Sequence, residues 1–97
     1  ISIYTIVSPS MTPNVNVYDV VVNIRVDDPT KINVGDIITF KQDNDFITHR
    51  VISNNKDTFV TKGDYNNTSD NPIDLDKVVG KLVCKIPSVG VVGNVLL

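Results

Sequence analysis

Apolar and polar positions divide this chain into short, strand-like segments. Val and Ile dominate the apolar residues, and such β-branched side chains suit pleated strands. Asn, Asp, Gly and Pro, which favour turns, lie between the stretches. The predicted strands cover residues 1–7, 17–26, 37–40 and onward, 46–52, 58–62, 78–86 and 91–97. This spacing predicts one domain over residues 1–97 with a mostly all-β fold, a small antiparallel β-sandwich or a partly open barrel.

Two segments break the strand pattern. Residues 8–13, Ser-Pro-Ser-Met-Thr-Pro, form a rigid bend between two strands, because proline cannot extend a regular ladder. The strand pattern also fails over residues 63–76, where residues 63–72 form a long polar loop and residues 73–79 could hold a single helical turn. Ordered loops of this length are often functional.

Composition limits the possible partners. The 97 residues are 41% hydrophobic and 21% charged, with a net charge of −2. No Lys/Arg cluster is present, so nucleic acid is not an expected partner. No stretch approaches the roughly 20 apolar residues of a transmembrane helix. The lone cysteine, Cys84, excludes an intrachain disulfide, and its apolar neighbours predict a small buried side chain.

The bend offers a candidate nucleophile. Ser8 and Ser10 alternate along the chain, so in an extended segment their side chains point to the same side. If Ser10 attacks, the hydroxyl of Ser8 and nearby backbone N–H groups could stabilise a developing oxyanion. The alternative is an ordinary turn with two capping hydroxyls.

Other stretches offer a base and an acid. His49 is the only histidine, and an unperturbed imidazole titrates near ~6.5, which suits proton transfer near neutrality. Lys62 is a rival base, provided that it is buried. Asp64 and Asp70 are both candidates for the carboxylate that orients an imidazole. One His and one distant Cys do not make a zinc site, and the 63–70 loop lacks the rest of an EF-hand.

Together, and in this order, the motifs resemble those of type I signal peptidases over nearly the whole chain. The matching segments are residues 8–13 (the family's Ser-x-Ser-Met-x-Pro box), 34–40 (its Val-Gly-Asp strand start), 48–51 (the box of the general base), 61–70 (its Lys-Gly-Asp-Asn-Asn loop), and 78–81 and 86–90 (its closing strands). Because His49 stands where most bacterial members have Lys, the chain resembles the Ser/His subgroup. That subgroup comprises the endoplasmic-reticulum-like, archaeal and sporulation-associated Gram-positive enzymes.

The resemblance implies a role for each matched residue. Ser10 is the nucleophile, His49 the general base and Asp70 the best match to the third member of the triad. Asp64 matches a supporting aspartate, and Ser8 matches the position that assists the oxyanion hole. Proximity to Ser10 in the sequence suggests Ile6, Met11 and Val20 as walls of the substrate pockets.

The chain also departs from the family pattern at three positions. Asn14 stands where Thr is usual, Tyr18 where Gly is usual, and Pro9 where Gly is common. Tyr18 matters most, because a glycine there suggests a position with positive φ.

The implied activity is removal of signal peptides from exported preproteins after small residues at −1 and −3. The resemblance implies no cofactor or metal. It also implies a transmembrane anchor outside this chain and a catalytic domain on the extracytoplasmic face of the cell membrane. Two rival functions are a self-cleaving repressor-type serine protease core and a non-catalytic β-domain for protein interaction. In the second rival, Ser10 and His49 need not meet.

Overall fold

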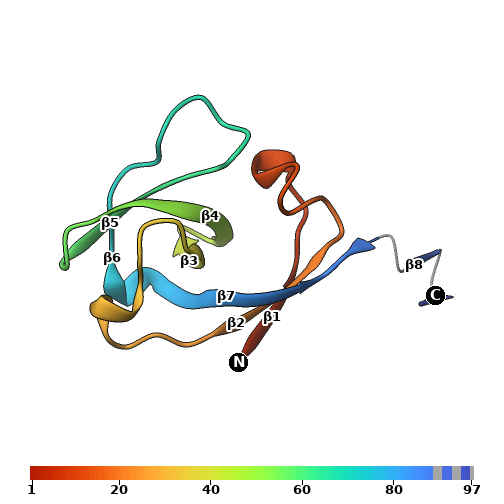
Figure 1. The fold of residues 1–97 in the computed structure, drawn as a ribbon, viewed down its shortest axis with the longest axis horizontal. Coiled ribbons are helices and arrows are strands. Elements are labelled where there is room, and N and C mark those ends of the chain that lie inside the picture. Colours follow the sequence, from red (N-terminus) through yellow and green to blue (C-terminus); the bar gives the residue numbers. More distant parts are fainter. Residues whose placement is uncertain (89–90, 93–94, 97) are drawn as a thin grey trace.

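The computed structural model describes residues 1–88, 91–92 and 95–96, and strands account for most of its regular structure (Figure 1). The strands are β1 (Ser2–Thr5), β2 (Val20–Ile24), β3 (Ile37–Gln42), β4 (Asp45–Asn54), β5 (Thr58–Lys62), β6 (Ile73–Asp74), β7 (Val78–Ile86), β8 (Val91–Val92) and β9 (Val95–Leu96). Three single 3₁₀ turns join them: η1 (Pro9–Met11), η2 (Pro29–Lys31) and η3 (Leu75–Lys77). None of the helical segments described is long and apolar enough to cross a membrane. The all-β prediction is confirmed.

Seven strands form one antiparallel sheet in the order β1-β2-β7-β3-β4-β5-β6, and β8 and β9 pair separately. A sandwich needs two sheets packed face to face, so that alternative is wrong, and the open single sheet is the form that occurs. The sheet curls, bringing β1 near the start of β4. There the rings of Tyr4 and Phe46 lie 5.1 Å apart between centroids.

Several predicted segments match the strands closely. β5 and β7 have the predicted bounds, and β3 and β4 form the predicted hairpin, with Gln42 paired to Asp45. Asp43 in the hairpin turn has φ 54°, a conformation that Asp tolerates. The predicted helical turn is the 3₁₀ turn η3, and residues 73–74 before it add the short strand β6, which the sequence pattern did not predict. The prediction for residues 91–97 falls partly outside the described residues.

β2 is shorter than the predicted strand over 17–26, because the chain turns at its start. Asp19 is 2% exposed, and its carboxylate accepts a hydrogen bond from the backbone N–H of Asn16 at 2.8 Å. Tyr18 has φ 73°, so it cannot continue an extended strand. This is the position where the sequence suggested a need for positive φ, and that expectation is confirmed.

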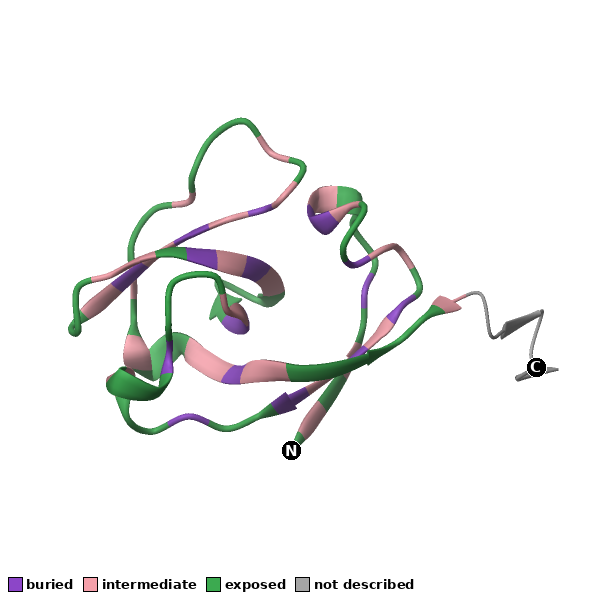
Figure 2. Cartoon of the chain, viewed as in Figure 1, coloured by how far each residue is buried: buried purple, intermediate pink, exposed green. Residues whose placement is uncertain are grey.

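Buried residues recur along several strands and in the turn η1 (Figure 2), and their apolar side chains form two clusters. The larger contains Val26, Ile32, Ile38, Phe40, Val51 and Phe59. The smaller contains Ile6, Met11, Val15 and Val21, and it lies under the bend that carries Ser10. Cys84 is exposed, so its predicted burial is wrong. It pairs with Val22 on β2, whereas the buried residue Val21 pairs with Lys85, so Cys84 lies on the opposite, outer face of the sheet.

Candidate active site

Ser10 lies in the middle of the 3₁₀ turn η1, and residues 6–8 connect this turn to the edge strand β1. Ser8 caps this turn, and Pro9 occupies its first position, where the missing N–H of proline costs nothing. Met11 is 1% exposed and anchors the turn in the smaller apolar cluster. The predicted bend over residues 8–13 thus contains a tight turn, with Ser8 at its start and Ser10 in its middle. The two serines are therefore not related by the alternation of an extended segment.

Three side chains from distant parts of the sequence form one hydrogen-bonded chain. His49 Nε2 lies 3.0 Å from Ser10 Oγ, and His49 Nδ1 lies 2.6 Å from Asp70 Oδ2. An ionised carboxylate only accepts hydrogen bonds, so the neutral imidazole donates through Nδ1 and accepts the Ser10 O–H through Nε2. This geometry allows His49 to remove the proton of the Ser10 hydroxyl.

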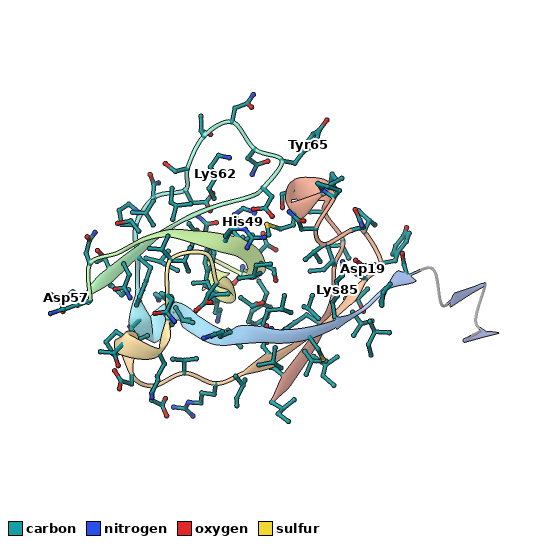
Figure 3. All side chains as sticks on the ribbon, viewed as in Figure 1. Asp19, His49, Asp57, Lys62, Tyr65 and Lys85 are labelled. Carbon is teal, nitrogen blue, oxygen red and sulfur yellow. The ribbon has the colours of Figure 1, made fainter. Side chains whose placement is uncertain are left out.

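The position of His49 follows from the β4 strand pattern. His49 is 7% exposed and packs against the edge of Phe40, with ring centroids 6.3 Å apart at 73°. Its neighbours on β4, Thr48 and Arg50, point to the other face. Figure 3 shows His49 between β4 and the turn that carries Ser10.

The two loop carboxylates have different partners. Asp70 contacts His49, whereas Asp64 makes a two-pronged ion pair with Arg50, with both N···O distances 2.8 Å. Asn14 Nδ2 also donates to Asp64 Oδ2 at 2.8 Å. The hydrogen bonds from Arg50 hold the pKa of the Asp64 carboxyl below its ordinary value of 3.8. Of the two candidates for the acid beside His49, Asp70 is the one in contact with the imidazole.

The loop after β5 is fastened to the turn of Ser10. Tyr65 N donates to the backbone oxygen of Ser10 at 2.9 Å, and Asp64 N donates to Met11 Sδ at 3.3 Å. Gly63 is needed for this approach, because an added Cβ would lie 2.7 Å from the Ser10 carbonyl oxygen. The loop and the nucleophile turn thus form one unit, although about 50 residues separate them in the sequence.

A cleft of about 530 Å³ opens beside Ser10. Its walls are residues 4–8, which run from the end of β1 to the nucleophile turn, and residues 46–49 of β4, and Met11 and Asn66 complete the lining. Ile6 and Met11 line it as predicted. Val20 is not among the lining residues and instead pairs with Thr5 on one side and Ile86 on the other.

Ser8 lines the same cleft, and its Oγ accepts a hydrogen bond from the backbone N–H of Ser10 at 3.3 Å. Both groups thus lie next to the nucleophile. The hydroxyl proton of Ser8 and the N–H of Ser10 are the two donors that can face an oxyanion, once the contact between them opens.

Lys62, the rival base, does not line the cleft. It is half-buried on β5, opposite Arg50, whereas His49 Nε2 occupies the position beside Ser10 Oγ. Among the described residues, no three His, Cys, Asp or Glu side chains gather to form a metal site.

Several residues of the site were not predicted from the sequence. Arg50 and Asn14 bind Asp64, Thr61 binds Asp70, and Asn66 lines the cleft together with other residues of 4–7 and 46–48. Arg50 follows the histidine directly, which was the only local signal for it. The remaining contacts join segments that are far apart or cross the loop, and no spacing in the sequence indicates them.

A scan against models of known protein families finds no match for this chain, and neither does a search of curated proteins.

Proposed function

We propose that this chain is the catalytic domain of a membrane-anchored serine endopeptidase that removes signal peptides from exported proteins, with its active site on the extracytoplasmic face. One observation carries the proposal: the chain of hydrogen bonds Ser10–His49–Asp70, at 3.0 Å and 2.6 Å. The order of the sequence motifs supports the same conclusion. The interaction-module rival would be favoured by a Ser10 far from His49, and the short distance between them argues against it.

In the proposed mechanism, Ser10 Oγ attacks the carbonyl carbon of the scissile peptide bond while its proton passes to His49 Nε2. Asp70 holds the ring and stabilises the imidazolium that forms. The negative charge on the carbonyl oxygen is met by the Ser10 N–H and the Ser8 hydroxyl. The imidazolium then gives its proton to the leaving amine, which departs. Water, deprotonated by His49, hydrolyses the Ser10 acyl ester and releases the signal peptide.

Two unpaired strand edges favour an extended substrate. Ile6 hydrogen-bonds through its backbone to the segment just before β2: its N–H donates to the Asp19 carbonyl oxygen at 2.9 Å, and its carbonyl oxygen accepts from the Tyr18 N–H at 2.7 Å. Alternate residues of a strand direct these groups to opposite sides, so Thr5 and Val7 present theirs to the cleft. Across the cleft, residues 46–49 pair with β3 alone among the described strands, because pairing of β4 with β5 begins at Arg50. A substrate strand can add its backbone to such an edge.

The cleft lining suits small side chains. In an extended substrate the −1 and −3 side chains point the same way, toward one surface. The apolar groups available near Ser10 are Ile6, 9% exposed, and Met11, 1% exposed, and both are packed into the core. Packed side chains leave shallow pockets, which fits the small residues at −1 and −3.

The test uses the membrane-anchored protein and a preprotein with Ala at −1 and −3. We expect the wild type to cleave after −1, and a matched preprotein with Leu at −1 to resist cleavage, since a full pocket excludes extra methylenes. Ser10→Ala should cleave neither. Cleavage of the Ala substrate by the Ser10→Ala variant, or equal cleavage of both substrates by the wild type, contradicts the proposal.

A further inference from the structure

Thr61, on β5, contacts Asp70, the acid of the hydrogen-bonded chain, at the same oxygen as His49 does. Its Oγ1 lies 2.7 Å from Asp70 Oδ2, the same oxygen that His49 Nδ1 approaches at 2.6 Å. The carboxylate only accepts hydrogen bonds, so the Thr61 hydroxyl is the donor. Both side-chain hydrogen bonds that the structure gives Asp70 therefore meet at one oxygen.

The backbone repeats this attachment. Asp70 N donates to the Thr61 carbonyl oxygen at 2.8 Å. The loop therefore leaves β5 after Lys62 and returns to Thr61 at Asp70, where backbone and side-chain hydrogen bonds both hold it. Thr61 is 0% exposed, whereas the Asp70 side chain is 25% exposed. A partly exposed carboxylate is thus fixed by a fully buried hydroxyl.

The residue type suits this role. A β-branched side chain on a strand has a restricted χ1, so the hydroxyl has little freedom to turn away. β5 also pairs with β4, where Val51 lies opposite Thr61 and His49 is two residues earlier. The same pair of strands therefore sets the imidazole and the hydroxyl that hold Asp70 between them.

We propose that Thr61 is a positioning residue, which acts through Asp70 to keep the His49 ring aligned with Ser10. This inference rests on the proposed peptidase function. Without the hydroxyl, the Asp70 carboxylate is free to rotate toward solvent, and the imidazole loses the partner that fixes its orientation. Thr61 does not line the cleft, so substrate binding does not depend on it.

The test compares Thr61→Val, which removes the hydroxyl at nearly constant volume, with Thr61→Ser, which keeps it. We expect Thr61→Val to lower kcat about 10- to 100-fold with KM unchanged, the range for losing a hydrogen bond to a charged group. Thr61→Ser should recover most of the loss. A KM increase without a fall in kcat, or equal impairment of the Ser and Val variants, overturns the proposal.

Thr39→Val is the matched control for the loss of a buried threonine hydroxyl. Thr39 is also 0% exposed, but its hydroxyl bonds to Thr48 and Asn23 and does not reach Asp70. We expect this variant to be destabilised, while its folded fraction keeps the wild-type kcat. A kcat loss equal to that of Thr61→Val would show a general packing effect and overturn the proposal.

A second readout separates this inference from the peptidase function. The proton on His49 Nδ1 gives a proton NMR signal whose position and sharpness report the bond to Asp70. We expect the signal to weaken or shift in Thr61→Val and to stay in Thr61→Ser. If the wild type cleaves no substrate, the proposed peptidase function is wrong. The NMR signal still tests, independently of cleavage, whether Thr61 positions Asp70 against His49. An unchanged signal in folded Thr61→Val overturns the positioning role.

Discussion

At the scale of single residues, two carboxylates of one loop have different roles because they face different partners. Asp70 faces an imidazole and a hydroxyl, whereas Asp64 faces a guanidinium and an amide. The sequence indicated that both belong to the site and matched Asp70 to the acid, but the residues alone left the choice open. The hydrogen-bond partners distinguish the two carboxylates: Asp70 contacts His49, and Asp64 contacts Arg50. Arg50 and Thr61 lie on β4 and β5, and the sequence did not specify how these strands pair.

The ion pair of Asp64 gives a pH-dependent contribution to stability. Its folded pKa lies below 3.8, so the contribution is present above the unfolded pKa and is lost as pH falls through the folded one. We expect Asp64→Asn to lower the unfolding free energy by about 1.5–3 kcal/mol at pH 7. The deficit should shrink as pH falls below about 4, the ordinary pKa of an aspartate. Urea unfolding at several pH values measures this difference.

Asp27→Asn is the control for this experiment. Asp27 also pairs with an arginine, Arg25, at 2.9 Å, but both side chains are more than three-quarters exposed, at 77% and 79%. Water and salt screen such a pair, so little change in stability is expected at any pH. A deficit in Asp64→Asn that stays constant down to pH 2 would contradict the role given to its charge.

At the scale of elements, the segment between η1 and β2 shows where local pattern and structure disagree. The apolar residues over 17–26 predicted a continuous strand, but the turn at Tyr18 and Asp19 delays its start to Val20. Burial tends to raise the pKa of Asp19, yet hydrogen bonds from the backbone N–H groups of Asn16 and Ser88 hold it below its ordinary value. Here the hydrogen bonds between the buried Asp19 carboxylate and the backbone of its own turn outweigh the β propensity of the neighbouring apolar residues.

Tyr18→Gly should stabilise the protein. Left-handed backbone costs a residue with a Cβ about 1–2 kcal/mol, and Tyr18, at φ 73°, is 70% exposed and so loses little packing. Glycine costs about 0.5–1 kcal/mol in chain entropy. We therefore expect a net gain of about 0.5–1 kcal/mol in thermal or urea unfolding.

Tyr18→Ala is the matched variant, because it removes the ring and keeps the Cβ. It should show no such gain. If Tyr18→Gly is less stable than the wild type, or if Tyr18→Ala gains as much, the left-handed backbone is not the cause.

At the scale of the whole molecule, the site depends on contacts that the linear pattern does not contain. The positions of most strands and of the main turns were predictable, because runs of β-branched residues favour extended backbone and clusters of Asn, Asp and Gly favour turns. The meeting of Ser10 with His49, 39 positions apart, and of His49 with Asp70, 21 apart, depends on the curl of the sheet and the register of β4 with β5. The motif resemblance predicted these pairs, and no periodicity did.

The central claim is that Ser10, His49 and Asp70 act as one catalytic unit, and a double-mutant comparison tests it most directly. Processing of a signal-peptide preprotein is measured for Ser10→Ala, His49→Ala and the double variant in the membrane-anchored protein. We expect each single change to lower kcat at least about 10³-fold and the double variant to be no slower than the singles, because members of a unit are not additive. Wild-type processing by Ser10→Ala, or losses that multiply in the double variant, would contradict the claim.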